Sequence, residues 1–178
     1  MNRIPVVRCC AALAVCVLFP ALAAAADYTY LEGGFIDRHD YGTDGGGVRV
    51  AGSFGLPLMP LAVFGEYDST DNLDQFDVGA LFHAPLLPVL DLFGGASLEH
   101  ADVHDHSDTG IGARAGVRWR VLPQLELAPE LRYVDLYHDG QTSVRLNALY
   151  RIAPRLDLQA AVQGGDERRF EAGLRFNF

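Results

Sequence analysis

FEAGLRFNF, residues 170–178, ends the 178-residue chain, and its side chains alternate between two chemical kinds. Phe170, Ala172, Leu174, Phe176 and Phe178 fall on one side, whereas a glutamate, a glycine, an arginine and an asparagine fall on the other. Because successive side chains of a β-strand point to opposite faces, this stretch predicts a strand with one apolar and one polar face. Chain termini are usually solvated, so an apolar face that continues to the last residue predicts an apolar environment around this strand.

Two earlier stretches alternate in the same way. Residues 110–121 place apolar side chains on one face and Arg114, Arg118 and Arg120 on the other, and residues 142–152 repeat the pattern with two further arginines. A water-soluble sandwich cannot bury three arginines of one strand in its core. The pattern therefore favours strands whose polar face lines the interior of a barrel.

Prolines and acidic connections divide the chain into evenly spaced segments. Prolines at positions 60, 88, 123 and 154 each come just before a candidate strand, and acidic, glycine-rich connections at 38–46, 68–73, 100–108, 138–140 and 164–167 alternate with them. This spacing predicts an array of antiparallel hairpins. The ten predicted strands are residues 28–36, 46–55, 61–67, 74–83, 89–99, 109–121, 125–136, 142–152, 156–163 and 168–178.

These strands fit a membrane barrel. Each is near the ~9–11 residues that cross a bilayer when tilted, and an even number lets the first and last strands pair and close the sheet. We therefore predict an all-β, antiparallel up-and-down transmembrane β-barrel of about 10 strands. Pro129 would bulge or break the seventh strand, which leaves eight strands as an alternative. A soluble lipocalin-like barrel or β-sandwich, with the apolar face buried, is the other alternative.

The start of the chain predicts export. Arg3 and Arg8 precede an apolar run, and four alanines end it at Ala26, so residues 1–26 read as a cleaved signal peptide and residues 27–178 as the mature barrel. A membrane anchor is the weaker interpretation, because the run is shorter than the ~20 residues of a spanning helix. All three cysteines lie inside this leader, so the mature chain has no thiol. A formal net charge of −9 argues against nucleic acid as a partner.

Aromatic residues on the apolar faces test the membrane orientation. They gather near both strand ends, as expected for two interfacial girdles. The group near the proline turns is Phe54, Phe82, Trp119, Tyr150, Phe176 and Phe178, and the group near the acidic connections is Phe35, Tyr67, Tyr133 and Phe170.

The opposite faces carry charges of both signs, which we expect to pair inside the lumen because guanidinium groups bind carboxylates in a bidentate manner. The predicted lumen charges are Glu32, Arg49, Glu66, Asp77, Asp91, Glu99, Arg114, Arg118, Glu126, Glu130, Arg132, Arg145, Arg151, Asp157, Glu171 and Arg175.

The terminal strand, the leader and the hairpin array together resemble small bacterial outer-membrane β-barrel proteins of the OmpA/OmpX-like type, within the porin-like superfamily. The resemblance covers the whole mature chain and implies an outer-membrane location. It also implies that Phe176 and Phe178 form the signal that the barrel-assembly machinery reads during insertion. The partners it implies are outer-membrane lipids and lipopolysaccharide, and a closed barrel of this kind can stand alone as a monomer.

The sequence predicts a structural or surface-interaction role and no cofactor, because ten strands are far fewer than the ~16–18 of aqueous porins. A narrow diffusion pore is the alternative. A lipid-modifying enzyme ranks lower, since no serine has an assured histidine base. Metal binding by the 100–108 segment ranks lower as well; its candidate ligands for zinc, copper or nickel are His100, His104, His106 and Asp108. Loop carboxylates are also expected to face lipopolysaccharide phosphates and to be bridged there by calcium or magnesium. These carboxylates are Asp37, Asp40, Asp68, Asp71, Asp102, Asp105, Asp135, Asp139, Asp166 and Glu167.

Overall fold

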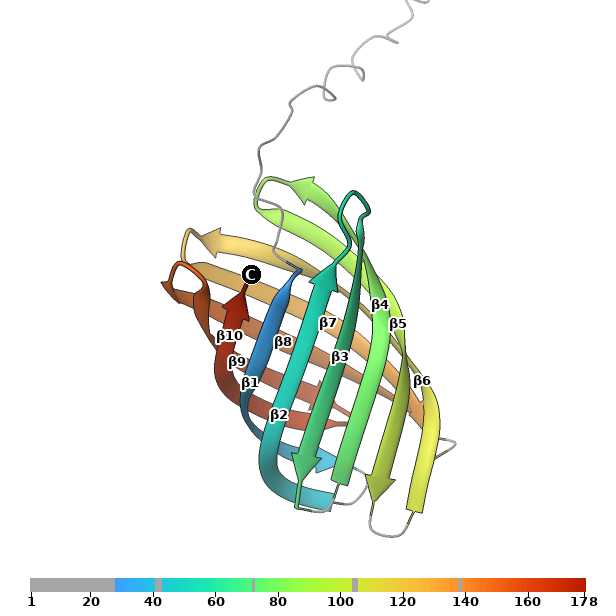
Figure 1. Ribbon diagram of the computed structural model, residues 1–178. Coiled ribbons are helices and arrows are strands. Elements are labelled where there is room, and N and C mark those ends of the chain that lie inside the picture. Colours follow the sequence, from blue (N-terminus) through green and yellow to red (C-terminus); the bar gives the residue numbers. More distant parts are fainter. Residues whose placement is uncertain (1–27, 41–42, 72, 104–105, 138) are drawn as a thin grey trace, which may run out of the picture.

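A computed structural model describes residues 28–40, 43–71, 73–103, 106–137 and 139–178. The expected signal peptide and its cleavage near Ala26 lie outside these residues. The described chain forms ten tilted antiparallel strands that close into a barrel (Figure 1). Their bounds are β1 Tyr30–Asp40, β2 Thr43–Gly55, β3 Leu61–Thr70, β4 Leu73–Leu87, β5 Leu90–Val103, β6 His106–Leu122, β7 Leu125–Leu136, β8 Asp139–Ala153, β9 Leu156–Gly165 and β10 Arg168–Asn177.

Pairing of the first and last strands closes the sheet. Each strand pairs with the next in sequence, and β1 pairs with β10 in a continuous antiparallel register from Tyr30 opposite Asn177 to His39 opposite Arg168. Every strand therefore has two neighbours, and the barrel has no open edge. The predicted ten-strand up-and-down barrel is confirmed, and the eight-strand alternative is wrong.

Pro129 neither breaks nor bulges β7. It faces outward and pairs in register with Leu146 of β8. The pairing of β7 with β6 is interrupted beside it, between Gly116 and Trp119, because the proline nitrogen has no hydrogen to donate. The register shifts lie instead near proline turns, for example between Arg120 and Leu122.

The barrel has two distinct ends, which we name by their connections. The proline-turn end holds the β2–β3, β4–β5, β6–β7 and β8–β9 connections and the C-terminus, and the acidic-loop end holds the other five connections (Figure 1). The acidic connections are shorter than the sequence predicted, because strand pairing continues through most of them. Residues 100–103 belong to β5 and residues 106–108 to β6, so the predicted 100–108 loop is largely a paired hairpin.

The outer face of the barrel is apolar around its circumference. All ten aromatic side chains of the two predicted girdles are exposed, as are many leucines, valines and isoleucines between them. An exposed apolar surface of this extent requires a lipid environment. The soluble alternatives, which bury these residues, are therefore wrong. No helix in the described part of the chain has the length and hydropathy to cross a bilayer.

The inner face is filled in layers. An apolar cluster of Leu73, Ala101, Val134 and Leu136 lies at the acidic-loop end. A second apolar cluster, Phe64, Leu81 and Phe93, lies nearer the proline-turn end. Buried charged side chains occupy the space between and around these clusters. The candidate functional residues therefore lie in the lumen.

Candidate functional site

The candidate site is the set of charged side chains that point into the barrel. Strand alternation places them there, because each lies at an inward position between two lipid-facing residues. Of the predicted lumen charges, most are less than a tenth exposed: Glu32, Arg49, Glu66, Asp77, Asp91, Glu99, Arg118, Glu130, Arg132, Arg145, Asp157, Glu171 and Arg175. The side chains of Arg114 and Glu126 are also largely buried. Arg151 differs, because its side chain is about half exposed at the rim, where it pairs with Asp157.

Arg49 of β2 lies at the centre of the lumen. Its Nη1 atom donates to Glu32 Oε1 at 2.8 Å, and its Nη2 atom donates to Glu66 Oε2 at 2.9 Å. Glu32 also accepts from Arg175 Nε at 2.6 Å. The three strands β10, β1 and β2 are neighbours, so these pairs tie the closing seam of the barrel to β3.

Glu66 connects opposite walls. Its Oε1 atom lies 2.9 Å from Arg169 Nη1 and 3.7 Å from Arg132 Nη1. These two arginines come from β10 and β7, whereas Glu66 belongs to β3, so the contacts cross the lumen. Arg132 continues the network to Asp77 at 3.5 Å, and Asp77 accepts from Arg114 Nη2 at 3.0 Å.

Glu171 of β10 completes the central network. Arg145 of β8 donates to its Oε2 atom at 2.5 Å, and the guanidinium groups of Arg49 and Arg169 lie 3.6 and 3.5 Å from its carboxylate. Guanidinium and carboxylate groups from five strands thus form hydrogen bonds and ion pairs across the barrel interior. Because removal of one member leaves a buried charge without its counter-charge, such a network holds its members firmly in place. We call these residues, Arg49, Glu66, Arg132, Arg145, Arg169 and Glu171, the ion-pair plug.

A further layer of buried ion pairs, which the sequence did not predict, lies near the acidic-loop end. Arg169 lies 2.9 Å from Asp68 and 2.7 Å from Glu167, and Arg38 Nε lies 3.0 Å from Glu167. Arg38 also donates to Gln75 Oε1 at 2.5 Å. These side chains are buried. The expectation that Asp68 and Glu167 face lipopolysaccharide is therefore wrong.

Strand alternation explains this correction. Asp68 lies two residues after the inward Glu66, and it keeps the inward face because β3 extends past its predicted end. Arg169 lies two residues before the inward Glu171, inside the predicted last strand, and shares the inward face of that residue. This two-residue spacing was the signal available in the sequence. Glu167 lies in the β9–β10 connection, outside the strands. Burial alone would raise the pKa of Glu167, but Arg169 and Arg38 outweigh burial and lower it to about 2.

Tyr137 joins two hairpins at the acidic-loop end. It follows β7 with a left-handed backbone (φ 53°), and its hydroxyl lies within hydrogen-bond distance of the carbonyl oxygens of Ala101 and His106, at 2.9 and 3.0 Å. Its backbone N–H donates to Asp108 Oδ2 at 2.5 Å. The β7–β8 connection is thereby fastened to the β5–β6 hairpin beside the apolar cluster of Leu73 and its neighbours.

Two cavities occupy the proline-turn half of the lumen. One, of about 60 Å³, lies beside the plug and is lined by Tyr28, Tyr30, Phe64 and several of the charged residues. The other, of about 290 Å³, lies at the proline-turn end. Arg118 and Glu126 line both cavities, and Arg118 Nε donates to Glu126 Oε1 at 2.6 Å, so this ion pair lies on the boundary between them.

Aromatic rings hold three of the arginines around the smaller cavity. The guanidinium carbon of Arg114 lies 4.2 Å from the ring centre of Phe64. The guanidinium carbon of Arg118 lies 4.7 Å from the ring centre of Tyr28, and that of Arg175 lies 3.9 Å from the ring centre of Tyr30. Cation–π contacts of this kind fix the plane of the guanidinium group. Each of these arginines is therefore positioned on one side by a ring and on the other by a carboxylate.

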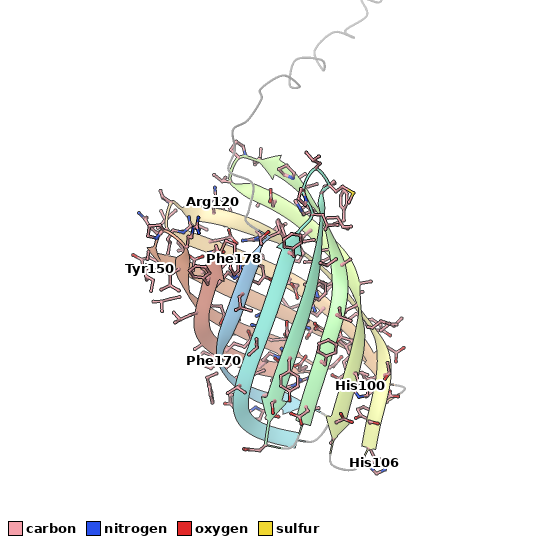
Figure 2. All side chains as sticks on the ribbon, in the orientation of Figure 1. His100, His106, Arg120, Tyr150, Phe170 and Phe178 are labelled. Atoms are coloured by element: carbon pink, nitrogen blue, oxygen red, sulfur yellow. The ribbon has the colours of Figure 1, made fainter. Side chains whose placement is uncertain are left out.

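The histidine segment does not assemble a metal site among the described residues. His100 faces outward and shares a hydrogen bond of 2.8 Å with Thr109 Oγ1, whereas Asp108 faces the inner side opposite Ala101. His106 lies at the tip of β6 and His104 lies outside the described residues. No group of three potential ligands close enough for a metal ion exists in the described ranges. Figure 2 shows His100 and His106 at the end of the barrel opposite Arg120 and Phe178.

Comparisons with known proteins relate the fold but not the sequence. No protein-family model matches the chain, and no curated protein matches it. Among solved structures, the KdgM porin superposes with a TM-score of 0.54 at 14% identity, over 83% of this chain and 99% of that one. The NanC porin superposes with a TM-score of 0.55 at 10% identity, over 84% of this chain and 100% of that one. The fold is of the outer-membrane porin type.

A third solved structure, KdgM porin in complex with disordered oligogalacturonate, gives a TM-score of 0.55 at 14% identity, over 84% of this chain and 99% of that one. At such identities the likeness concerns the fold. Together with the lipid-facing outer surface, the porin-type fold supports an outer-membrane location for this chain.

Proposed function

We propose that the protein is an integral outer-membrane barrel whose lumen is closed at rest, so that it serves a structural or surface-interaction role, as in the OmpA/OmpX-like barrels that the sequence resembles. The observation that carries this proposal is the ion-pair plug. Glu66 bonds Arg49 of β2 and Arg169 of β10, and lies within ion-pair distance of Arg132 of β7, so charged side chains join strands on different sides of the barrel.

The dimensions of the lumen support a closed state. The cavity beside the plug measures about 60 Å³, which holds a few water molecules but no hydrated solute. Beyond the plug, toward the acidic-loop end, lie the buried Asp68, Arg38 and Glu167 and then the apolar cluster around Leu73. A solute would have to displace ion pairs and apolar side chains in turn.

A narrow diffusion pore is the second candidate. The cavity of about 290 Å³ at the proline-turn end favours it, because this cavity reaches into the lumen as far as the Arg118–Glu126 pair. The porin-type fold is consistent with it. In this version of the proposal, arginines and carboxylates exchange partners and open a transient aqueous path.

The remaining partners belong to the same proposal. We infer that outer-membrane lipids and lipopolysaccharide surround the exposed apolar belt, and that the barrel-assembly machinery inserts the chain through β10. The outward Phe176 and Phe178 support the second point, because both rings are exposed and pack edge to face, with 5.1 Å between their centres.

Single-channel recording of the refolded mature chain in a planar bilayer tests the proposal. Folding is first verified by a compact band in unboiled electrophoresis that shifts on heating. We expect a heat-modifiable protein without steady conductance, because the plug leaves no continuous aqueous path. Discrete, steady conductance of the wild-type protein would overturn the closed barrel in favour of the pore.

A further inference from the structure

The cavity at the proline-turn end is rich in guanidinium groups. It has a volume of about 290 Å³ and is lined by Arg118, Arg120, Arg151 and Arg155. We propose that this cavity binds a small soluble anion, whose phosphate or carboxylate groups contact the arginines. The inference goes beyond the closed-barrel function, because a binding site at this mouth needs no passage through the plug.

The carboxylates in this cavity are already engaged. Glu126 accepts from Arg118 Nε at 2.6 Å, and Asp157 accepts from Arg151 Nε at 3.1 Å and from Asn177 Nδ2 at 2.8 Å. The lining guanidinium groups outnumber the carboxylates even when the terminal carboxylate of Phe178 is included. The mouth therefore carries excess positive charge on a chain that is acidic as a whole.

The arginines converge from two hairpins, β6–β7 and β8–β9. Arg120 lies near the end of β6, Arg151 near the end of β8, and Arg155 in the β8–β9 turn. The Arg151 side chain is about half exposed, so its remaining N–H groups are accessible. Within the described chain, no hydrogen bond or ion pair occupies the side chain of Arg155. Planar guanidinium groups that approach from different directions suit an anion with several oxygens.

The two rims of the barrel differ in charge. The acidic-loop end exposes carboxylates, among them Asp74, Asp102, Asp139 and Asp166. The proline-turn end exposes Arg151 and Arg155. In Figure 2, Arg120 lies at the end of the barrel that also bears Phe178. A soluble anion is therefore repelled from one mouth and attracted to the other.

The position of the arginines favours a soluble anion over a lipid headgroup. Arg120 and Arg151 take inward positions, whereas their neighbours Trp119, Tyr150 and Ile152 face the lipid and are exposed. A headgroup beside the barrel meets those apolar residues first. An anion dissolved on the proline-turn side enters the cavity directly.

Isothermal titration of the refolded, detergent-solubilised protein with citrate and with inorganic phosphate tests the site. We expect saturable binding by the wild-type protein and about tenfold weaker binding by Arg155→Gln, since a charge-assisted hydrogen bond contributes on the order of 1.5 kcal/mol. Arg155 lies in an exposed turn, so this variant is expected to fold. Arg120→Gln provides a second variant. Arg168→Gln is the matched control, because Arg168 is an exposed arginine near the opposite end of β10.

The outcomes separate the possibilities. Unchanged affinity in Arg168→Gln alongside the loss in Arg155→Gln supports the cavity. Equal losses in all variants would reduce the effect to overall charge and overturn the site, as would the absence of binding by the wild-type protein. Repetition in nanodiscs of neutral lipid and of anionic lipid identifies the source of the anion. If anionic lipid abolished citrate binding in the wild-type protein, the cavity would hold headgroups instead of a soluble anion.

Discussion

At the scale of single residues, the lumen shows how a buried carboxylate is tolerated when several guanidinium groups surround it. Glu66 lies within ion-pair distance of Arg49, Arg132 and Arg169. Replacement of a whole buried network by apolar residues is often harmless, whereas removal of one partner leaves uncompensated charge. The plug is therefore sensitive to single substitutions and less sensitive to complete replacement.

Glu66→Ala is expected to lower the free energy of unfolding by about 3 kcal/mol. The cause is the loss of the counter-charge for Arg49 and Arg169, both buried. Urea-dependent unfolding in detergent, followed by the heat-modifiable band, measures the effect. Asp139→Asn is the control, because Asp139 is exposed and its loss should change stability by less than ~0.5 kcal/mol. Equal stability of the two variants would contradict the role assigned to Glu66.

Glu167 gives a pH-dependent prediction. Its pKa is about 2 in the folded protein, below the ordinary value of 4.5. The ionised form therefore contributes stability that is fully present above pH 4.5 and is lost as the pH falls toward 2, by about 3 kcal/mol in total. The difference in stability between the wild-type protein and Glu167→Gln should shrink over that range of pH. A difference that stays constant from pH 6 to pH 2 would exclude this carboxylate as the cause.

At the scale of elements, strand type and number followed from the sequence, and strand ends did not. The two-residue alternation in 110–121 and 142–152 identified β6 and β8, but the acidic and glycine-rich composition of 100–108 suggested a loop. In the structure β5 and β6 stay paired up to Val103 and His106. Polar composition reports solvent exposure, and a strand that extends beyond the membrane is also exposed, so composition alone does not locate the turn.

Phe178, which follows β10, is expected to matter for membrane insertion and not for folding. Deletion of Phe178 should reduce insertion of the chain into the outer membrane of living cells while leaving refolding in detergent intact. The reason is that β10 pairs with β1 up to Asn177, so the register of the closed barrel does not depend on the last residue. Membrane fractionation with the heat-modifiable band measures insertion, and Phe170→Ala is the control within the same outward row. Similar losses in both would show that apolar area, and not the terminal position, directs insertion.

At the scale of the whole molecule, the sequence predicted which side chains enter the lumen better than it predicted what they do there. Inward positions follow from alternation, so Arg49, Glu66 and Glu171 were identified without a structure. Their partners could not be, because contacts such as that between Glu66 and Arg169 join strands distant in sequence and depend on the closed barrel. The layer of Arg38 and Glu167 was missed for a related reason: Arg38 lies beyond the predicted end of the first strand and Glu167 lies in a connection, so alternation within the predicted strands assigned neither to the lumen.

Removal of the central residues of the plug is expected to open the barrel to ions. Simultaneous substitution of Arg49, Glu66, Arg169 and Glu171 by serine removes two carboxylates and two guanidinium groups, so the net charge of the chain stays the same. Arg132 and Arg145 of the plug then lose the carboxylates of Glu66 and Glu171. The shorter side chains should connect the cavity of about 60 Å³ with the space toward the acidic-loop end, and steady single-channel conductance should appear in a protein that is silent in its wild-type form. Serine substitution of Asp74, Asp139, Arg155 and Arg168, which are exposed and also balance in charge, is the control and should remain silent. A silent plug variant that still shows the heat-modifiable band would place the barrier elsewhere, at the apolar cluster of Leu73, Ala101, Val134 and Leu136.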